Sequence, residues 1–135
     1  MTSFSKDIIG YDYNIEEAQN LLKEAGFPHG EGLSPIILNT TDAYLDLCEY
    51  IQNQLQKIGI HIKIEVNPSS THRQMVASSK VDFFRASWIA DYPDPENYLS
   101  LFYSKNLWNN GLNTTHFYSE EYDTLYEKAV RESDV

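Results

Sequence analysis

The stretch IILNTTDAYLDLCEYIQNQLQKIGIHIKIEV, residues 36–66, decides the fold of this chain. Its first residues, 36–38, are all apolar, which predicts a short strand buried on both faces. Apolar side chains then recur at helical spacing over residues 44–58, and Gly59 ends that pattern. Residues 60–66 alternate apolar and polar side chains, which is typical of a strand with one solvated face. A strand, a helix and a strand joined by short loops form a βαβ unit, so the two strands should be parallel.

Two further helices are marked by their first residues. Residues 14–25 should form a helix, because Asn14 is a good N-cap residue and Glu17 follows three positions later. Ser119 is predicted to cap the last helix of the chain in the same way. Residues 1–13 carry little pattern, and we expect them to be a poorly structured leader.

The segments that join these elements are mostly polar. A short helix is predicted over residues 69–79, capped by a serine, with His72 and Arg73 on its solvated face. Residues 103–115 read as a long loop, and Asn-Asn-Gly at 109–111 is its strongest turn signal. A loop of this length inside a compact domain is often functional.

Composition and element order together indicate a single domain over residues 1–135. The fold class should be α/β, with a small, mostly parallel sheet flanked by helices. A hydrophobic fraction of 41% and an aromatic fraction of 13% fit a globular chain with a core. The net charge of −10 argues against nucleic acid and anionic membrane surfaces as partners, because both require clustered Lys and Arg.

No metal or other cofactor is predicted. The histidines His29, His61, His72 and His116 are scattered and lack metal-ligand spacing, and no glycine-rich phosphate loop occurs. Cys48 is the single cysteine, which excludes an internal disulfide, and its helical context predicts a small buried hydrophobe. The sequence also contains no apolar run of membrane-spanning length and no visible signal peptide.

A second informative stretch follows the βαβ unit. Residues 81–89 are mostly apolar and predict a buried strand, which Asp-Tyr-Pro-Asp-Pro at 91–95 ends because proline has no N–H for a ladder. Asp94 should cap a new helix, with Pro95 in its first turn.

This turn is the best candidate for a binding site. Ligands of open α/β sheets bind beyond the carboxyl ends of the strands, which would place Asp91 at that edge, close to Trp88 and Tyr92. A carboxylate between aromatic rings suits a cationic or amphipathic ligand. Strand alternation would put Arg85 on the face opposite Trp88.

No catalytic arrangement is evident. The chain has no G-x-S-x-G motif and no ordered triad, and Asp94 is already needed as a helix cap. A binding module is therefore favoured over an enzyme. Two alternatives stay open: a hydrolase that uses Asp91 and Asp94, and an interaction domain with a Tyr- and Trp-rich face.

Four motifs, in this order along the chain, resemble those of the peptide-binding proteins of bacterial ABC importers, a family that includes oligopeptide, dipeptide and nickel binders. The motifs are YNIEEAQNLLKEAGF at 13–27, IQNQLQKIGI at 51–60, WIADYPDP at 88–95 and YSEEYDTLYEKA at 118–129. They extend over most of the chain. The resemblance implies one lobe of a type II periplasmic binding protein.

The resemblance also implies roles for individual residues. The aspartate at the position of Asp91 binds the α-amino group of the peptide, and a basic residue at the position of Arg85 meets a peptide carboxylate. Trp88 and Tyr92 would form the wall of the pocket. A family member that binds a non-peptide solute, such as a nickel complex or an oligosaccharide, is the alternative.

Further expectations concern the whole protein. Family members close two lobes over the ligand, and this chain covers most of one lobe, so we expect it to be a fragment that binds ligand weakly or not at all by itself. The full-length protein would be periplasmic or on the cell surface and would deliver its solute to an ABC permease. Its membrane contact would depend on a signal or lipid anchor that this sequence lacks.

Overall fold

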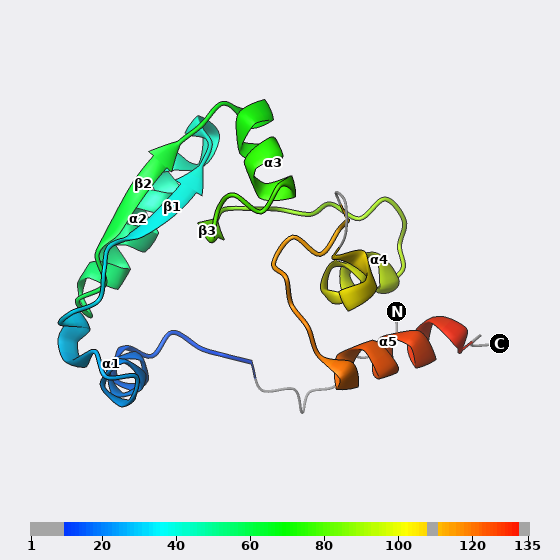
Figure 1. Ribbon diagram of the computed structural model, residues 1–135, viewed down its shortest axis with the longest axis horizontal. Helices are drawn as coiled ribbons and strands as arrows, with labels where there is room; N and C mark the ends of the chain where they lie inside the picture. Colours follow the sequence, from blue (N-terminus) through cyan, green and yellow to red (C-terminus); the bar gives the residue numbers. More distant parts are fainter. Residues whose placement is uncertain (1–9, 108–110, 133–135) are drawn as a thin grey trace.

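The computed structural model describes residues 10–107 and 111–132. Its helices and strands follow the order α1 (Ile15–Glu24), β1 (Ile36–Thr40), α2 (Leu45–Gln56), β2 (Ile62–Val66), α3 (Ser69–Ala77), β3 (Phe83–Phe84), α4 (Glu96–Leu99) and α5 (Glu120–Arg131). Short 3-10 turns, η1 to η4, lie at Pro28–Gly30, Asp42–Tyr44, Ser100–Phe102 and Ser104–Asn106. The elements form an arc that runs from α1 through the sheet and α3 to α4 and α5 (Figure 1).

The βαβ unit is confirmed. β1 pairs with β2 in parallel from Ile36 opposite Ile62 to Thr40 opposite Val66, and β3 adds to the other side of β1, also in parallel. The strand order is therefore β2-β1-β3. This is the small parallel sheet flanked by helices that the sequence predicts.

The apolar core lies between α2 and one face of the sheet. Leu38 and Cys48 are 2% and 0% exposed, and they cluster with Ile62. Cys48 is thus the buried hydrophobe that its helical spacing indicates. The prediction that the first strand is buried on both faces is wrong at Ile37, which is 43% exposed, because α2 covers only the opposite face.

Local capping signals are confirmed at two helices. Asn14 Oδ1 accepts the N–H of Glu17 at 3.0 Å, and Ser119 Oγ accepts the N–H of Tyr122 at 3.2 Å. The serine cap expected for α3 is absent: Pro68 precedes the helix and makes no side-chain cap bond. Both serines already lie inside the first turn, past the position from which a side chain can cap.

The third strand is much shorter than predicted. A strand is expected over residues 81–89, yet β3 contains only Phe83–Phe84. Arg85 N still donates to Asn39 O at 2.9 Å, but the next partner, Thr41, has its carbonyl turned toward Tyr44 N in the turn η2. Because β1 has already turned away, the ladder cannot continue.

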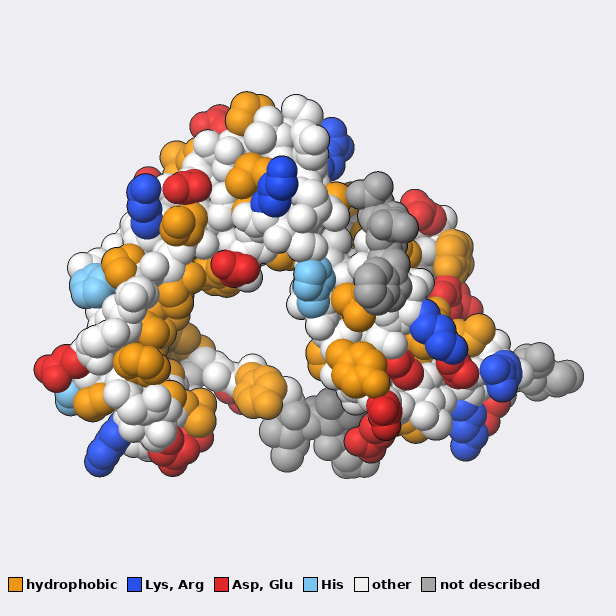
Figure 2. Space-filling model, in the orientation of Figure 1, with side chains coloured by type: hydrophobic (Ala, Val, Ile, Leu, Met, Phe, Trp, Pro, Cys, Tyr) orange, Lys and Arg blue, Asp and Glu red, His pale blue; other side chains and the backbone are white. Residues whose placement is uncertain are grey.

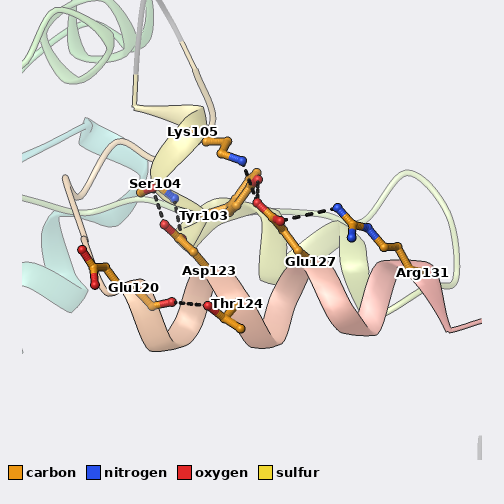
Figure 3. A network of polar contacts seen from close by, with 8 residues as sticks. All are labelled: Tyr103, Ser104, Lys105, Glu120, Asp123, Thr124, Glu127 and Arg131. Carbon is orange, nitrogen blue, oxygen red and sulfur yellow. Dashed lines mark hydrogen bonds and ion pairs between the residues drawn. The ribbon is translucent and has the colours of Figure 1, made fainter.

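Polar contacts join α5 to the segment before it (Figure 3). Asp123 Oδ1 accepts the N–H of Ser104 at 3.0 Å, and Glu127 Oε1 accepts Lys105 Nζ at 2.7 Å and Tyr103 OH at 2.5 Å. The Lys105 ammonium lowers the pKa of the Glu127 carboxyl, and the Tyr103 hydroxyl adds to this effect.

Within the segment predicted as a long loop, the Asn113 side chain makes further contacts. Asn113 is 1% exposed, and its Nδ2 donates to Phe117 O at 2.9 Å, while its Oδ1 accepts the N–H of Phe117 at 3.2 Å. Of the turn expected at 109–111, residues 109 and 110 lie outside the described residues. The expected leader at 1–13 is likewise described only from residue 10, and residues 10–13 contain no helix or strand.

None of the helices in the described ranges has the length and apolar character needed to span a membrane.

Two glycines fix how the turn after α1 meets the end of α2. Gly59 has φ +88° and Gly30 has φ +75°, and a Cβ on Gly59 would lie 1.8 Å from His29 O. We expect Gly59→Ala to lower the free energy of unfolding by at least about 3 kcal/mol, because a positive φ and a backbone clash act together.

Gly32→Ala is the matched control for Gly59→Ala. Gly32 also has a positive φ, +83°, but a Cβ there meets nothing within 4 Å, so about 1–2 kcal/mol should be lost. Urea denaturation of both variants measures the difference. Equal losses would show that the close approach of Gly30 and Gly59 contributes nothing to stability.

Candidate functional site

One candidate site is a hollow of about 740 Å³ beside the carboxyl ends of β1 and β3. It lies between α3, the segment that leaves β3, the turn η3 and residues 111–115. Aromatic and basic side chains both line it, among them Tyr44, Arg73, Arg85, Trp88 and Phe102. Hydrophobic side chains also gather along the inner edge of the arc on the side of the sheet and α1, at the left of the view (Figure 2).

Arg85 and Trp88 both line this hollow. The expectation that they lie on opposite faces is wrong, because strand alternation stops with β3 at Phe84. A hydrogen bond fixes the Trp88 ring, because its Nε1 donates to Asn97 Oδ1 at 2.6 Å. Asn97 itself is 4% exposed.

The Arg85 side chain is positioned by stacking. Its guanidinium carbon lies 3.1 Å from the centre of the Tyr44 ring, and Nη1 donates to Ser87 Oγ at 3.2 Å. A cation over an aromatic face is attracted by the ring's negative surface. This holds the guanidinium at the wall of the hollow, and no ion pair within the described residues involves it.

His72 is the residue that sequence reasoning missed. The expectation of a solvated face is wrong for it, because it is 7% exposed and its Nε2 lies 2.9 Å from Arg85 O. His72 and Val76 are four residues apart on α3 and both line the hollow, but this spacing alone gives no signal that His72 is buried.

Tyr92 belongs to a different hollow, of about 440 Å³, between α4 and α5. Its hydroxyl donates to Glu96, whose other oxygen accepts Tyr126 OH at 2.6 Å. The Tyr126 hydroxyl, followed by that of Tyr92, lowers the pKa of the Glu96 carboxyl. Burial, followed by the Glu96 carboxylate, raises the pKa of Tyr126. Asp94 Oδ1 accepts the N–H of Glu96 at 2.8 Å, which is the capping contact expected of it.

Asp91 is exposed and lines neither hollow. It lies seven residues beyond the end of β3 instead of at the sheet edge. Within residues 10–107 and 111–132, no hydrogen bond or ion pair engages its carboxylate. The same described residues contain no group of three or more His, Cys, Asp or Glu side chains that could hold a metal ion.

Comparison with known proteins identifies the family of the chain. The family model for bacterial extracellular solute-binding proteins, family 5 (middle), matches residues 1–110. The chain belongs to this family. Family 5 consists of solute-binding proteins, so the expectation of a binding module and not an enzyme is confirmed.

Two curated relatives show how similar the chain is to known proteins. It is 29% identical over 121 residues to the periplasmic oligopeptide-binding protein OppA of Escherichia coli, covering 88% of this chain and 22% of that protein. It is also 29% identical over 133 residues to heme-binding protein A of Haemophilus influenzae, covering 95% of this chain and 24% of that protein. The chain therefore spans about a quarter of the length of these relatives.

A solved structure of a periplasmic binding protein confirms the fold. The periplasmic binding protein DppA of Helicobacter pylori, in complex with the peptide STSA, superposes with a TM-score of 0.87 at 31% identity. The match covers 97% of this chain and 26% of that one. The α/β fold with a parallel sheet is thus that of a periplasmic binding protein.

Glu96 provides a test of the contact between α4 and α5. We expect Tyr126→Phe to raise the pKa of Glu96 toward its ordinary value of 4.5, because the hydroxyl that stabilises the carboxylate is removed. Since the folded pKa is depressed, the contribution of Glu96 to stability is complete above about pH 4.5 and is lost as the pH falls through the folded pKa.

Carbon-13 NMR titration of the Glu96 carboxyl measures this shift directly. Tyr118→Phe is the control, because the Tyr118 hydroxyl donates to Glu120 and not to Glu96. An unchanged Glu96 pKa in Tyr126→Phe would contradict the assigned contact.

Proposed function

We propose that this chain forms the ligand-binding lobe of a peptide-binding protein that serves an ABC importer. The observation that carries the proposal is the hollow beside the carboxyl ends of the parallel strands, in a chain of family 5. The named specificities of OppA and of the H. pylori protein support a peptide as the solute.

The segment that leaves β3 is proposed as the surface that meets the peptide. Asp91 pairs with the peptide ammonium, Arg85 meets a carboxylate, and Trp88, which lines the same hollow as Arg85, forms the wall. An ammonium that leaves water needs an ionised partner, and the Asp91 carboxylate is not engaged within the described residues.

The main chain of the same segment supports this role. Residues 86–91 have no helix or strand, and no backbone hydrogen bond engages them within the described part of the chain. Free N–H and C=O groups in an open segment can pair with an extended peptide, as an added strand does.

The large accessible surface area of the chain supports the proposal that it is one part of a larger, two-lobed protein. Its accessible surface is 10847 Å², whereas a compact protein of 15.6 kDa exposes about 7,200 Å². Closure of a second lobe over the ligand would enclose the hollow and present the complex to a permease. The location proposed for the complete protein is periplasmic or at the cell surface, and the names of two relatives state a periplasmic location for them.

A non-peptide solute is the second candidate. Heme-binding protein A of H. influenzae is as similar to this chain, at 29% identity, as E. coli OppA is. Membership of the family therefore leaves the ligand open, because one fold can carry several binding specificities.

Native mass spectrometry of the complete protein, purified without refolding, separates the two candidates. A peptide-binding protein should carry a series of peptide masses that is lost after mild denaturation. A single non-peptide mass would move the function to another solute. An empty protein that a peptide library also fails to stabilise in a thermal-shift assay would contradict both.

Asp91→Asn tests the ammonium contact in the same two-lobed protein. We expect peptide affinity to fall about tenfold or more, because the ammonium loses its ionised partner. Asp94→Asn is the matched control, since it removes the same charge three residues away and keeps an oxygen that can cap α4. Calorimetry that gives equal affinities for both variants would remove Asp91 from the site.

A further inference from the structure

Arg85 is held through both of its main-chain polar groups. Its N–H donates to Asn39 O of β1 at 2.9 Å, and its carbonyl oxygen accepts from His72 Nε2 on α3 at 2.9 Å. In a continued parallel ladder the carbonyl of Arg85 would instead pair with Thr41. The imidazole of His72 therefore replaces the strand partner at the residue where the sheet ends.

The protonation of His72 follows from its surroundings. A carbonyl oxygen can only accept, so Nε2 carries the hydrogen. Nδ1 is buried and has no hydrogen-bond partner in the described residues, so a second proton there would be a buried donor without an acceptor. Nε2 is thus the ring nitrogen that must carry a hydrogen for this contact to form.

Among the described residues, the charge of Arg85 takes part in no ion pair. The ion pairs among residues 10–107 and 111–132 join Lys63 to Glu65, and Lys105 and Arg131 to Glu127, and none involves Arg85. This holds although the chain has 20 acidic and 10 basic residues. The guanidinium lies over Tyr44 at the wall of the hollow, where its unused N–H groups can serve an anionic ligand group.

We propose that His72 is a positioning residue: by holding the carbonyl of Arg85, it sets the direction from which the guanidinium meets a carboxylate of the ligand. This inference rests on the proposed function. Without the bond from His72, the carbonyl would be free to rotate, and the side chain of Arg85 would leave Tyr44. A fixed guanidinium binds a carboxylate more tightly than a mobile one, because less freedom is lost on binding.

The test compares peptides that differ only in a carboxylate. Trialanine and its C-terminal amide form one pair, and the C-terminal amides of Ala-Glu-Ala and Ala-Gln-Ala form the other, so the pairs separate a terminal from a side-chain carboxylate. Calorimetry on the complete two-lobed protein gives the carboxylate preference, which is the ratio of the two affinities in a pair. We expect a preference of about tenfold in one pair, and its loss in Arg85→Gln.

His72→Leu should reduce this preference about fivefold and leave the affinity for the uncharged peptide within twofold. His72→Gln should restore it, because the amide Nε2 can donate to the same carbonyl. In the double variant with Arg85→Gln, His72→Leu should have no further effect on the preference, since it acts through Arg85. His61→Leu is the matched control, because His61 is exposed and lies at the start of β2.

Several results would overturn the inference. One is an equal loss of affinity for charged and uncharged peptides in His72→Leu. Another is a carboxylate preference that His72→Gln does not restore. The third is a further loss of carboxylate preference when His72→Leu is added to Arg85→Gln. Peptide binding without any carboxylate preference in either pair would overturn it and leave the proposed function intact, whereas no peptide binding at all would remove both. If His72→Leu does not fold, nitrogen-15 NMR of the unaltered protein decides, and a His72 Nε2 that carries no hydrogen would contradict the assigned bond.

Discussion

The parallel pairing of β1 with its two neighbours is the constraint on which the rest of the structure depends. β1 binds β2 along its whole length, and its carboxyl end determines how far β3 can extend. Once Thr41 turns into η2, the next residue on the other side, Arg85, has to find another partner for its carbonyl. The end of β1 therefore also ends β3, and the candidate site is built from the segment that leaves β3.

The two halves of the chain are stabilised in different ways. Around the sheet, apolar contacts among Leu38, Cys48 and Ile62 form a conventional core. Around α5, an aromatic cluster and side-chain hydrogen bonds predominate: Phe102, Phe117 and Tyr122 meet edge to face, with ring centres 5.4–6.3 Å apart. Such polar contacts depend on geometry, so this half holds its carboxylates and hydroxyls in defined positions.

The candidate site combines elements that are distant in the sequence. Tyr44 before α2, His72 on α3 and Arg85 after β3 meet at one point, although each belongs to a different segment. Asp91 is set apart from this point on an exposed turn. Its neighbours Tyr92 and Asp94 are tied to Glu96 at the start of α4, which ties the turn to that helix.

The sequence by itself determined the features that depend on neighbouring residues. Periodicity placed α2, β1 and β2, and the caps Asn14 and Ser119 marked the starts of α1 and α5, because each signal acts within one or two turns of the chain. The motif at 88–95 indicated the family, because a motif depends only on the order of residues along the chain. The tertiary structure alone decided where β3 ends, and therefore that Arg85 and Trp88 share one hollow. It also decided that His72 is buried, since hydrogen-bond partners contributed by remote segments leave no trace in local periodicity.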